Sequence, residues 1–300
     1  MLYLLQPLLQ QSRAQKRGRK GKVKPVFVSR QLEVKYRTEL RAISRICQQS
    51  VDDILLPALK PQVGDSTHHV ADGLLSRAQN ALKAARDSVI NQVTDYATEK
   101  LAETIVKRQQ QISDKQLAEN IKMSTGIDLY GLMQGESLED AVNEAVAANV
   151  SLIKSIPDQY FNSVQAAVLS GIQEGKSIAE ITKAVKKLGN STDARAELIA
   201  QDQLGKINGR LTQLRQQKMG ITHYYWATSR DERVRHSHRL RNGRLFAWDK
   251  PPDDGHPGIP IRCRCTAIPY IAHLIDPTAP KPEEIMARQT ANDELMRKAS

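Results

Sequence analysis

A helical pattern of apolar residues dominates this chain from about residue 30 to residue 219. Apolar side chains recur there every three or four positions, the spacing that gathers them on one face of an α-helix. Ala200, Leu204, Ile207, Leu211 and Leu214 follow alternating steps of four and three, which is typical of a helix that packs against another helix. We therefore expect a mostly α-helical, elongated body over residues 30–219.

Prolines, glycines and capping residues predict where several of these helices begin and end. Pro157 is expected in the first turn of a helix that ends at Gly175. Ser177 and Glu180 form a capping box that begins the next helix, and Gly189 is expected to end it. No catalytic constellation is evident among these helices, so we interpret the body as a scaffold.

The character of the chain changes after residue 220. Three short stretches rich in β-forming or aromatic residues follow, at 221–228, 245–248 and 261–268. Asn242-Gly243, between the first two, predicts a hairpin. The expected fold class is therefore α+β, with a mostly helical body followed by a small α+β or β-rich C-terminal module. A proline-containing linker and a short charged helix are expected after that module.

Basic residues are concentrated near the N-terminus. The chain has a net charge of +11, and residues 1–32 carry eight Lys or Arg and no acid, so they contribute +8 of it. Such a segment without periodicity is expected to be a disordered arm, here over residues 1–29. We interpret it as a DNA-binding arm, because each cation can neutralise a phosphate; the alternative is a solvated terminus with incidental charge. The candidate DNA-binding residues are Arg13, Lys16, Arg17, Arg19, Lys20, Lys22 and Lys24.

The three cysteines and the apolar start of the chain bear on its compartment. Cys263 and Cys265 are one residue apart, so a disulfide between them would be strained, and Cys47 alone gives no disulfide framework. We therefore expect a protein made in a reducing cytosol. The opening residues MLYLLQPLLQQ lack the charge and cleavage pattern of a signal peptide and are too short to span a bilayer, so no membrane association is expected.

A specific combination of motifs lies between residues 228 and 269. It begins with Asp231, Arg233, Arg235 and His238 in the order D-x-R-x-R-x-x-H and continues with Gly243. A proline-bounded loop through His256-Pro-Gly-Ile-Pro260 then leads to Cys263-Arg-Cys265. Together these residues resemble the C-terminal domain of phage Mu F-like minor head proteins, over about residues 190–272. Each piece alone is common, but all of them in this order make a specific signal.

This resemblance implies a minor capsid protein of a tailed bacteriophage that acts in head morphogenesis. It implies a place at the portal vertex or in the capsid interior of the virion, with passage through the host cytoplasm during assembly. The implied partners are the portal protein, major capsid and scaffold proteins and phage DNA, with several copies in each particle. No enzyme activity is implied. The expected domains are an arm at 1–29, a helical body at 30–190, a Mu F-like domain at 191–272, and a linker with a C-terminal helix at 273–300.

Four side chains of the motif region form a candidate Cys2His2 zinc set: His238, His256, Cys263 and Cys265, with His236 as an alternative ligand. Residues i and i+2 of a strand share a face, so the two cysteines are expected to point together. A structural zinc ion would help a small domain with few large apolar residues to fold. The alternative is two buried free cysteines and hydrogen-bonded surface histidines.

Asp231, Arg233 and Arg235 admit two interpretations as a structural motif. In the first, Asp231 orients an arginine within the domain, Arg233, and forms a local clamp. In the second, the arginines face DNA phosphates or an acidic neighbour. We favour the clamp for Asp231 and Arg233.

Two alternative functions remain open from the sequence. Asn242 and His256 within a histidine-rich basic module could belong to a metal-dependent nuclease of the HNH type. Against this, no Asp-His pair of the usual kind precedes the first hairpin, and the same histidines do not readily serve both structural zinc and catalysis. The second alternative is a cellular DNA-binding protein with a helical oligomerisation region.

Overall fold

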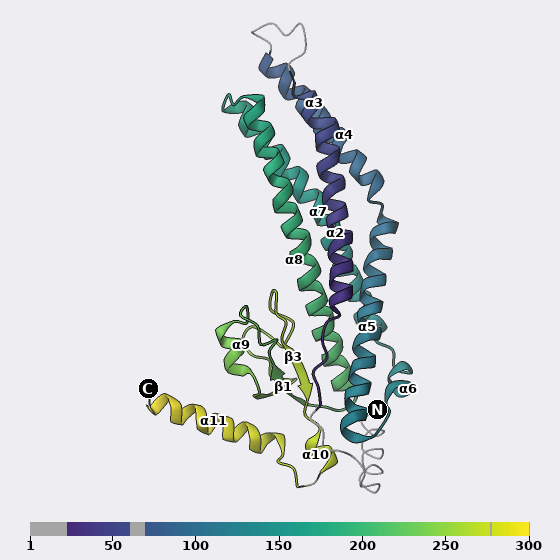
Figure 1. The fold of residues 1–300 in the computed structure, drawn as a ribbon, viewed down its shortest axis with the longest axis vertical. Helices are drawn as coiled ribbons and strands as arrows, with labels where there is room; N and C mark the ends of the chain where they lie inside the picture. Colours follow the sequence, from purple (N-terminus) through teal and green to yellow (C-terminus); the bar gives the residue numbers. More distant parts are fainter. Residues whose placement is uncertain (1–22, 61–69, 277, 300) are drawn as a thin grey trace. The chain divides into compact units, whose positions relative to one another are not determined.

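The computed structural model describes residues 23–60, 70–276 and 278–299 (Figure 1). Its body is helical and its C-terminal part contains one small antiparallel sheet, so the predicted α+β fold class is confirmed. The body elements are α2 (Arg30–Ser50), the π-helix η1 (Val51–Leu55), α3 (Leu56–Ala58), α4 (Val70–Gln92), α5 (Asp95–Thr125), α6 (Tyr130–Gln134), α7 (Glu139–Gln173) and α8 (Ile178–Lys218). The later elements are β1 (His223–Ala227), α9 (His236–Arg241), β2 (Leu245–Ala247), β3 (Thr266–Pro269), α10 (Ala272–Ile275) and α11 (Pro282–Ala299).

The chain divides into two compact units that are not consecutive in sequence. The first comprises the described parts of Met1–Arg30, Val106–Asn143 and Asp202–Ser300, and the second comprises Gln31–Ile105 and Glu144–Gln201. The helices α5, α7 and α8 each contribute residues to both units. This division by compactness does not test the consecutive domain boundaries predicted from the sequence, which stay a prediction.

The helix ends around residue 175 agree with the sequence pattern. Gly175 follows α7 with φ +69°, a conformation that glycine adopts without strain. Ser177 and Glu180 form the predicted capping box: the Glu180 backbone N–H donates to Ser177 Oγ at 3.3 Å, and the Ser177 N–H donates to Glu180 Oε2 at 2.8 Å. These two contacts satisfy donors that have no partner inside α8.

The prediction that Pro157 begins a helix is wrong. Pro157 lies inside α7, where its missing N–H and its ring are expected to cost about 3 kcal/mol. The helix continues because both sides of the proline are deeply buried. Ile153 and Ile156 are fully buried before it, as are Phe161 and Val164 after it. Tertiary packing of this face therefore outweighs the local signal.

The prediction that Gly189 ends a helix is also wrong, because α8 continues through it as one 41-residue helix. A Cβ atom at Gly189 would lie only 2.8 Å from Cδ of Gln48 on α2. The Gln48 side-chain amide in turn donates to the Gly189 carbonyl at 3.4 Å. Gly189 thus allows a close approach between two helices of the second unit and is not a helix terminator.

A short segment before α2 lies along α5 in the first unit. Gln116 on α5 accepts from the Phe27 N–H at 2.9 Å and donates to the Phe27 carbonyl at 3.2 Å, as a neighbouring strand would. Asn208 on α8 donates to the carbonyl of Val26 at 3.2 Å. Val26 is buried in an apolar cluster that includes Ile121 and Ile271. The chain is therefore fixed to this unit from about residue 23.

The sheet has the strand order β2-β1-β3, with both pairs antiparallel. Tyr224 lies opposite Phe246 on β2, and Trp226 lies opposite Ala267 on β3. β1 and β2 are consecutive antiparallel partners, as the hairpin signal at Asn242-Gly243 predicts, but their connection is longer than a tight turn because it contains α9. Asn242 instead accepts from the Thr228 N–H at 3.0 Å, so it closes the turn that follows α9.

Candidate metal centre

The last third of α8 provides the surface on which the site is built, and Figure 1 shows β1, β3 and α9 beside this part of the helix. Gly205 and Gly209 are one helical turn apart and face the loop 256–263. A Cβ atom at Gly209 would lie 2.5 Å from the Pro257 carbonyl oxygen, and one at Gly205 would lie 3.0 Å from the Cys263 carbonyl oxygen. The loop backbone therefore rests directly on the helix backbone, at a distance that other side chains would not permit.

Asp202, one turn before Gly205, fixes the end of this loop. Its Oδ1 accepts from the backbone N–H of Arg262 at 3.0 Å. Arg262 has φ +57°, a left-handed conformation that is unfavourable for a residue with a side chain. This turn, and not a strand, directs Cys263 inward, because β3 begins only at Thr266. The expectation that a strand includes both cysteines is therefore wrong.

His238 is held in place by its own helix α9 and by the loop after β2. Only 2% of His238 is exposed. Its Nε2 lies 2.9 Å from Oδ2 of Asp254, whose other oxygen pairs with Arg241. The ring also meets Trp226 edge-on, with 5.1 Å between ring centroids. A carboxylate at Nε2 favours the tautomer with its proton there, which leaves Nδ1 with a free lone pair.

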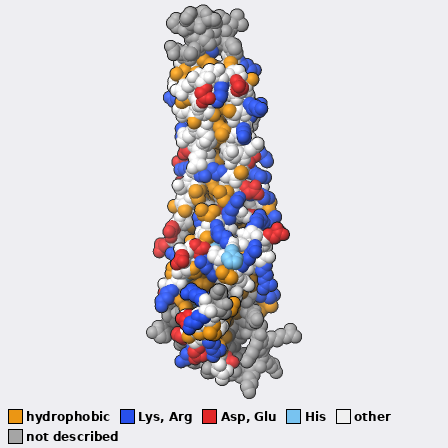
Figure 2. Space-filling view, turned by 90° about the vertical axis from the view of Figure 1, so that its left-hand side faces the viewer, with side chains coloured by type: hydrophobic (Ala, Val, Ile, Leu, Met, Phe, Trp, Pro, Cys, Tyr) orange, Lys and Arg blue, Asp and Glu red, His pale blue; other side chains and the backbone are white. Residues whose placement is uncertain are grey.

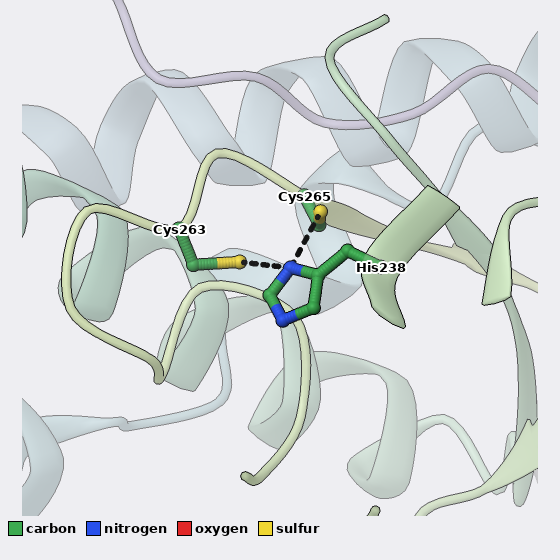
Figure 3. A group of neighbouring side chains, drawn as sticks. All are labelled: His238, Cys263 and Cys265. Carbon is green, nitrogen blue, oxygen red and sulfur yellow. Dashed lines mark hydrogen bonds between the residues drawn. The ribbon is translucent and has the colours of Figure 1, made fainter. Parts of the chain in front are cut away.

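The Nδ1 atom of His238 faces both cysteine sulfur atoms (Figure 3). It lies 3.6 Å from Sγ of Cys263 and 3.4 Å from Sγ of Cys265. The three atoms all lie within 4.8 Å of one another, and the two cysteines are 6% and 5% exposed. The backbone N–H of Gly258 also donates to Sγ of Cys263 at 3.4 Å. Two sulfur atoms and one nitrogen atom thus converge on one buried point.

The structure brings together three of the four predicted zinc ligands and does not include His256 in the group. The Nδ1 atom of His256 lies 2.9 Å from the hydroxyl of Tyr224, and its Nε2 lies 3.2 Å from the carbonyl oxygen of Trp248. Both ring nitrogens therefore have protein partners. His236, the alternative ligand, is exposed and also lies outside the group.

The acid–base properties of the group follow from these contacts. A hydrogen bond from the Cys265 thiol lowers the pKa of Cys263 below its ordinary value, although burial opposes the shift. Donating that hydrogen bond raises the pKa of Cys265, and burial acts in the same direction. Partial burial disfavours the ionised form of Asp254, but hydrogen bonds from His238 and Arg241 outweigh it and hold its pKa below the ordinary value.

The predicted clamp residue Asp231 does orient an arginine, but its ion pair is with the side chain of Arg264. Its contact with Arg233 is through the backbone, whose N–H donates to Asp231 Oδ1 at 3.0 Å. The Arg235 guanidinium donates to the carbonyl of Ile261 at 2.7 Å. Asp231 and Arg235 therefore both hold the segment that leads into the two cysteines, and the Arg233 side chain is exposed.

Most of the predicted DNA-binding residues lie outside the described residues: Arg13, Lys16, Arg17, Arg19, Lys20 and Lys22. Lys24 is described and its side chain is exposed, while its backbone carbonyl accepts from Asn120 on α5 at 3.0 Å. None of the described helices is long and apolar enough to cross a membrane.

Comparison with known proteins matches residues 162–268 to the family described as Phage Mu protein F like protein. This segment is thus similar to the Mu F-like family. The resemblance predicted from the motif residues is confirmed, although the match begins at residue 162, within α7, and not near residue 190. No solved structure matches the chain.

Similarity to a second protein extends beyond residues 162–268. An uncharacterized protein of Haemophilus influenzae (strain ATCC 51907 / DSM 11121 / KW20 / Rd) is 33% identical to this chain over 273 residues. The alignment covers 90% of this chain and 59% of that relative, so the chain spans about three fifths of the relative's length.

Several residues that build the candidate metal centre were not predicted from the sequence. Gly205 and Gly209 carried a usable signal, because two glycines four residues apart inside a strongly helical pattern indicate close backbone contact. Asp202 and Asp254 carried none. They are ordinary acidic residues in sequence, and only the folded loop brings them to the Arg262 N–H and to His238.

A cysteine, a histidine and an aspartate at this site also have the residue types of a nucleophilic Cys-His-Asp triad. Cys265, His238 and Asp254 have the required order of contacts, with 3.4 Å and 2.9 Å between successive atoms. A nucleophile must, however, be reached by its substrate, and here the cysteine and histidine are 5% and 2% exposed. The second sulfur on the same ring nitrogen also has no role in such a triad. Burial and composition therefore favour metal binding.

Proposed function

We propose that this chain is a minor head protein of a tailed bacteriophage that acts in head morphogenesis at the portal vertex, in DNA packaging or delivery. The observation that carries this proposal is the match of residues 162–268 to the phage Mu F-like family. The matched segment includes the part of α8 with Gly205 and Gly209, the sheet except its last residue, Pro269, and the Cys/His group, so the similarity includes the candidate site.

The partners in this proposal are the portal protein and other capsid proteins, with several copies of the chain in each virion. Co-expression of the tagged chain with the portal protein from the same phage genome tests it. We expect the portal protein to co-purify with the full chain, and not with an unrelated basic protein carrying the same tag. A phage lacking the gene should assemble defective heads. Heads of normal composition and infectivity from that deletion would contradict the proposal.

Phage DNA is the proposed ligand of the basic arm. Acidic and basic side chains are interspersed over the described part of the face in Figure 2, and this supports assigning the excess charge to the N-terminal segment. Each phosphate contact makes the slope of log K against log salt concentration more negative by about 0.9. Replacing Arg17, Arg19 and Lys20 by glutamine should therefore reduce the magnitude of the slope by about 2.7.

A matched control for the arm exists in α8, where Lys183, Lys186 and Lys187 are all exposed. Replacing these three residues by glutamine removes the same charge from the body, and we expect it to leave the salt slope unchanged. Equal effects of the two triple variants in a fluorescence anisotropy titration would argue for nonspecific attraction by net charge and against a DNA-binding arm.

We propose a structural and not a nucleolytic role for the histidines and for Asn242. His238 and His256 both have partners at their two ring nitrogens, and the Asn242 side-chain oxygen accepts from Thr228. These contacts support structural roles. Incubation of the protein with plasmid DNA and Mg²⁺ or Mn²⁺ tests this assignment. Cleavage that disappears in a His238→Ala variant would overturn it.

A further inference from the structure

We propose that His238, Cys263 and Cys265 bind one zinc ion through a single nitrogen and two thiolates. This site has one protein ligand fewer than the Cys2His2 set expected from the sequence, because His256 is not part of it. It stands independently of the role in the phage head, since it rests only on the geometry of the three side chains.

The two nitrogen–sulfur distances within the group are close to those of a tetrahedral zinc site. Zinc binds sulfur at about 2.3 Å and imidazole nitrogen at about 2.0–2.1 Å, so a tetrahedral angle separates the two ligand atoms by about 3.6 Å. The observed separations are 3.6 Å from His238 Nδ1 to Cys263 Sγ and 3.4 Å from His238 Nδ1 to Cys265 Sγ. Both edges that involve the nitrogen therefore match zinc coordination before any rearrangement.

Hydrogen bonding alone accounts less well for this arrangement. With the Nε2 proton directed at Asp254, the Nδ1 atom of His238 has one lone pair, yet two sulfur atoms approach it. Thiols are weak donors, and only one of the two can use the lone pair fully. A cation at the centre of the three atoms uses the lone pair and both sulfurs together.

The charges around the group also suit a divalent cation. Two thiolates neutralise Zn²⁺, so the complete cluster is uncharged and can be buried at low cost. Asp254 orients the ring through Nε2 and is itself paired with Arg241, the arrangement that commonly supports a histidine ligand. The N–H of Gly258 donates to Cys263 Sγ at 3.4 Å. A thiolate at Cys263 would give this donor a charged acceptor.

The same contacts exclude His256 as the fourth ligand in this conformation. Its two ring nitrogens are taken by Tyr224 and by the Trp248 carbonyl, so binding zinc would break both contacts. The three ligands come from α9 and from the segment just before β3, and the ion would therefore fasten α9 to the loop that lies on Gly205 and Gly209. Its role is to hold these two parts together.

Elemental analysis of the full chain, purified with reductant and without chelator from zinc-supplied cells, tests the proposal. We expect about one zinc per chain for the wild type and far less for Cys263→Ser, Cys265→Ser and His238→Ala. Cys47→Ala is the matched control, because Cys47 is an equally buried cysteine outside the group, and it should retain the zinc. His256→Gln should also retain it. Wild-type protein with little zinc, or equal loss in Cys47→Ala, would overturn the proposal.

A titration of the wild-type apoprotein with Co²⁺ keeps the test valid if a ligand variant fails to fold. We expect absorption bands of tetrahedral cobalt together with thiolate-to-metal charge transfer, and displacement of cobalt by one equivalent of Zn²⁺. The same spectrum from His256→Gln supports three protein ligands. A spectrum that lacks thiolate charge transfer would contradict the assignment, and a loss of the tetrahedral bands in His256→Gln would contradict the three-ligand site.

Discussion

The substitution Gly209→Ala sets two effects of opposite sign against each other. Alanine is favoured over glycine inside a helix by about 1 kcal/mol, so an open site would become more stable. At Gly209, however, the new Cβ would lie 2.5 Å from the Pro257 carbonyl oxygen and 3.3 Å from Cα of Gly258, where ordinary contact begins at 3.4 Å. The loop would have to move by nearly 1 Å, and overpacking of this kind typically costs about 1–3 kcal/mol.

We therefore expect Gly209→Ala to lower the free energy of unfolding by about 1 kcal/mol. Gly131→Ala is the control, because Gly131 is helical, exposed and has no atom within 4 Å of an added Cβ. It should be neutral or slightly stabilising, which puts the two variants about 1–2 kcal/mol apart, or about 0.5–1 M in urea midpoint.

Tryptophan fluorescence during urea unfolding measures this difference, because both tryptophans, Trp226 and Trp248, are in the C-terminal module. The same displacement would move Gly258 away from Cys263, so Gly209→Ala should also bind zinc more weakly. A Gly209→Ala variant at least as stable as Gly131→Ala would refute the close contact between α8 and the loop.

Three further predictions concern other contacts of the first unit. Asp114→Ala leaves the guanidinium of Arg215 buried without the carboxylate that it contacts twice at 2.7 Å, so we expect a loss of about 3–5 kcal/mol in urea unfolding, largely recovered when Arg215→Met is added. Gln216→Leu leaves the Trp248 indole N–H and the Ala267 carbonyl without their shared partner, and we expect a loss of about 1–3 kcal/mol; an unchanged fluorescence-detected midpoint would contradict this. The hydrogen bonds from Arg244 lower the pKa of Asp293, so this contact stabilises the folded state above the ordinary carboxyl value near 4 and is lost as the pH falls through the lower folded value. The protection factors of the α11 amides, which are corrected for the intrinsic pH dependence of exchange, should therefore fall under acid, and Asp293→Asn should remove that change.

The sequence predicted the fold class and the motif region because their signals are repeated or specific. Helical spacing recurs over the whole body, and the capping box at Ser177 and Glu180 is a local pattern with a local cause. Pro157 and Gly189 were misread because their effect depends on partners far away in sequence. Burial of the residues around Pro157 keeps α7 continuous through the proline. The close approach of Gln48 leaves no room for a side chain at position 189, which explains the glycine there.

The candidate site was predicted in part for a related reason. His238, Cys263 and Cys265 are recognisable as ligand types, and the structure brings them together. Whether His256 joins them depends on the direction of one loop, and that direction is set by contacts with Tyr224 and Trp248 that spacing does not reveal. Asp254 orients His238 from the same loop and is indistinguishable from other acidic residues in the sequence.

The attachment of residues 23–29 to α5 gives the basic arm a fixed point of origin. Val26 is held by Asn208 and buried, so Arg13 is separated from a firm anchor by 13 residues. A fully stretched chain advances about 3.5 Å per residue, which limits the distance between Arg13 and Val26 to about 45 Å. DNA that contacts Arg13 must therefore come within about that distance of the anchor. Energy transfer between a fluorophore on Phe27→Cys, an exposed position in the anchored segment, and one on a short DNA duplex should report this proximity.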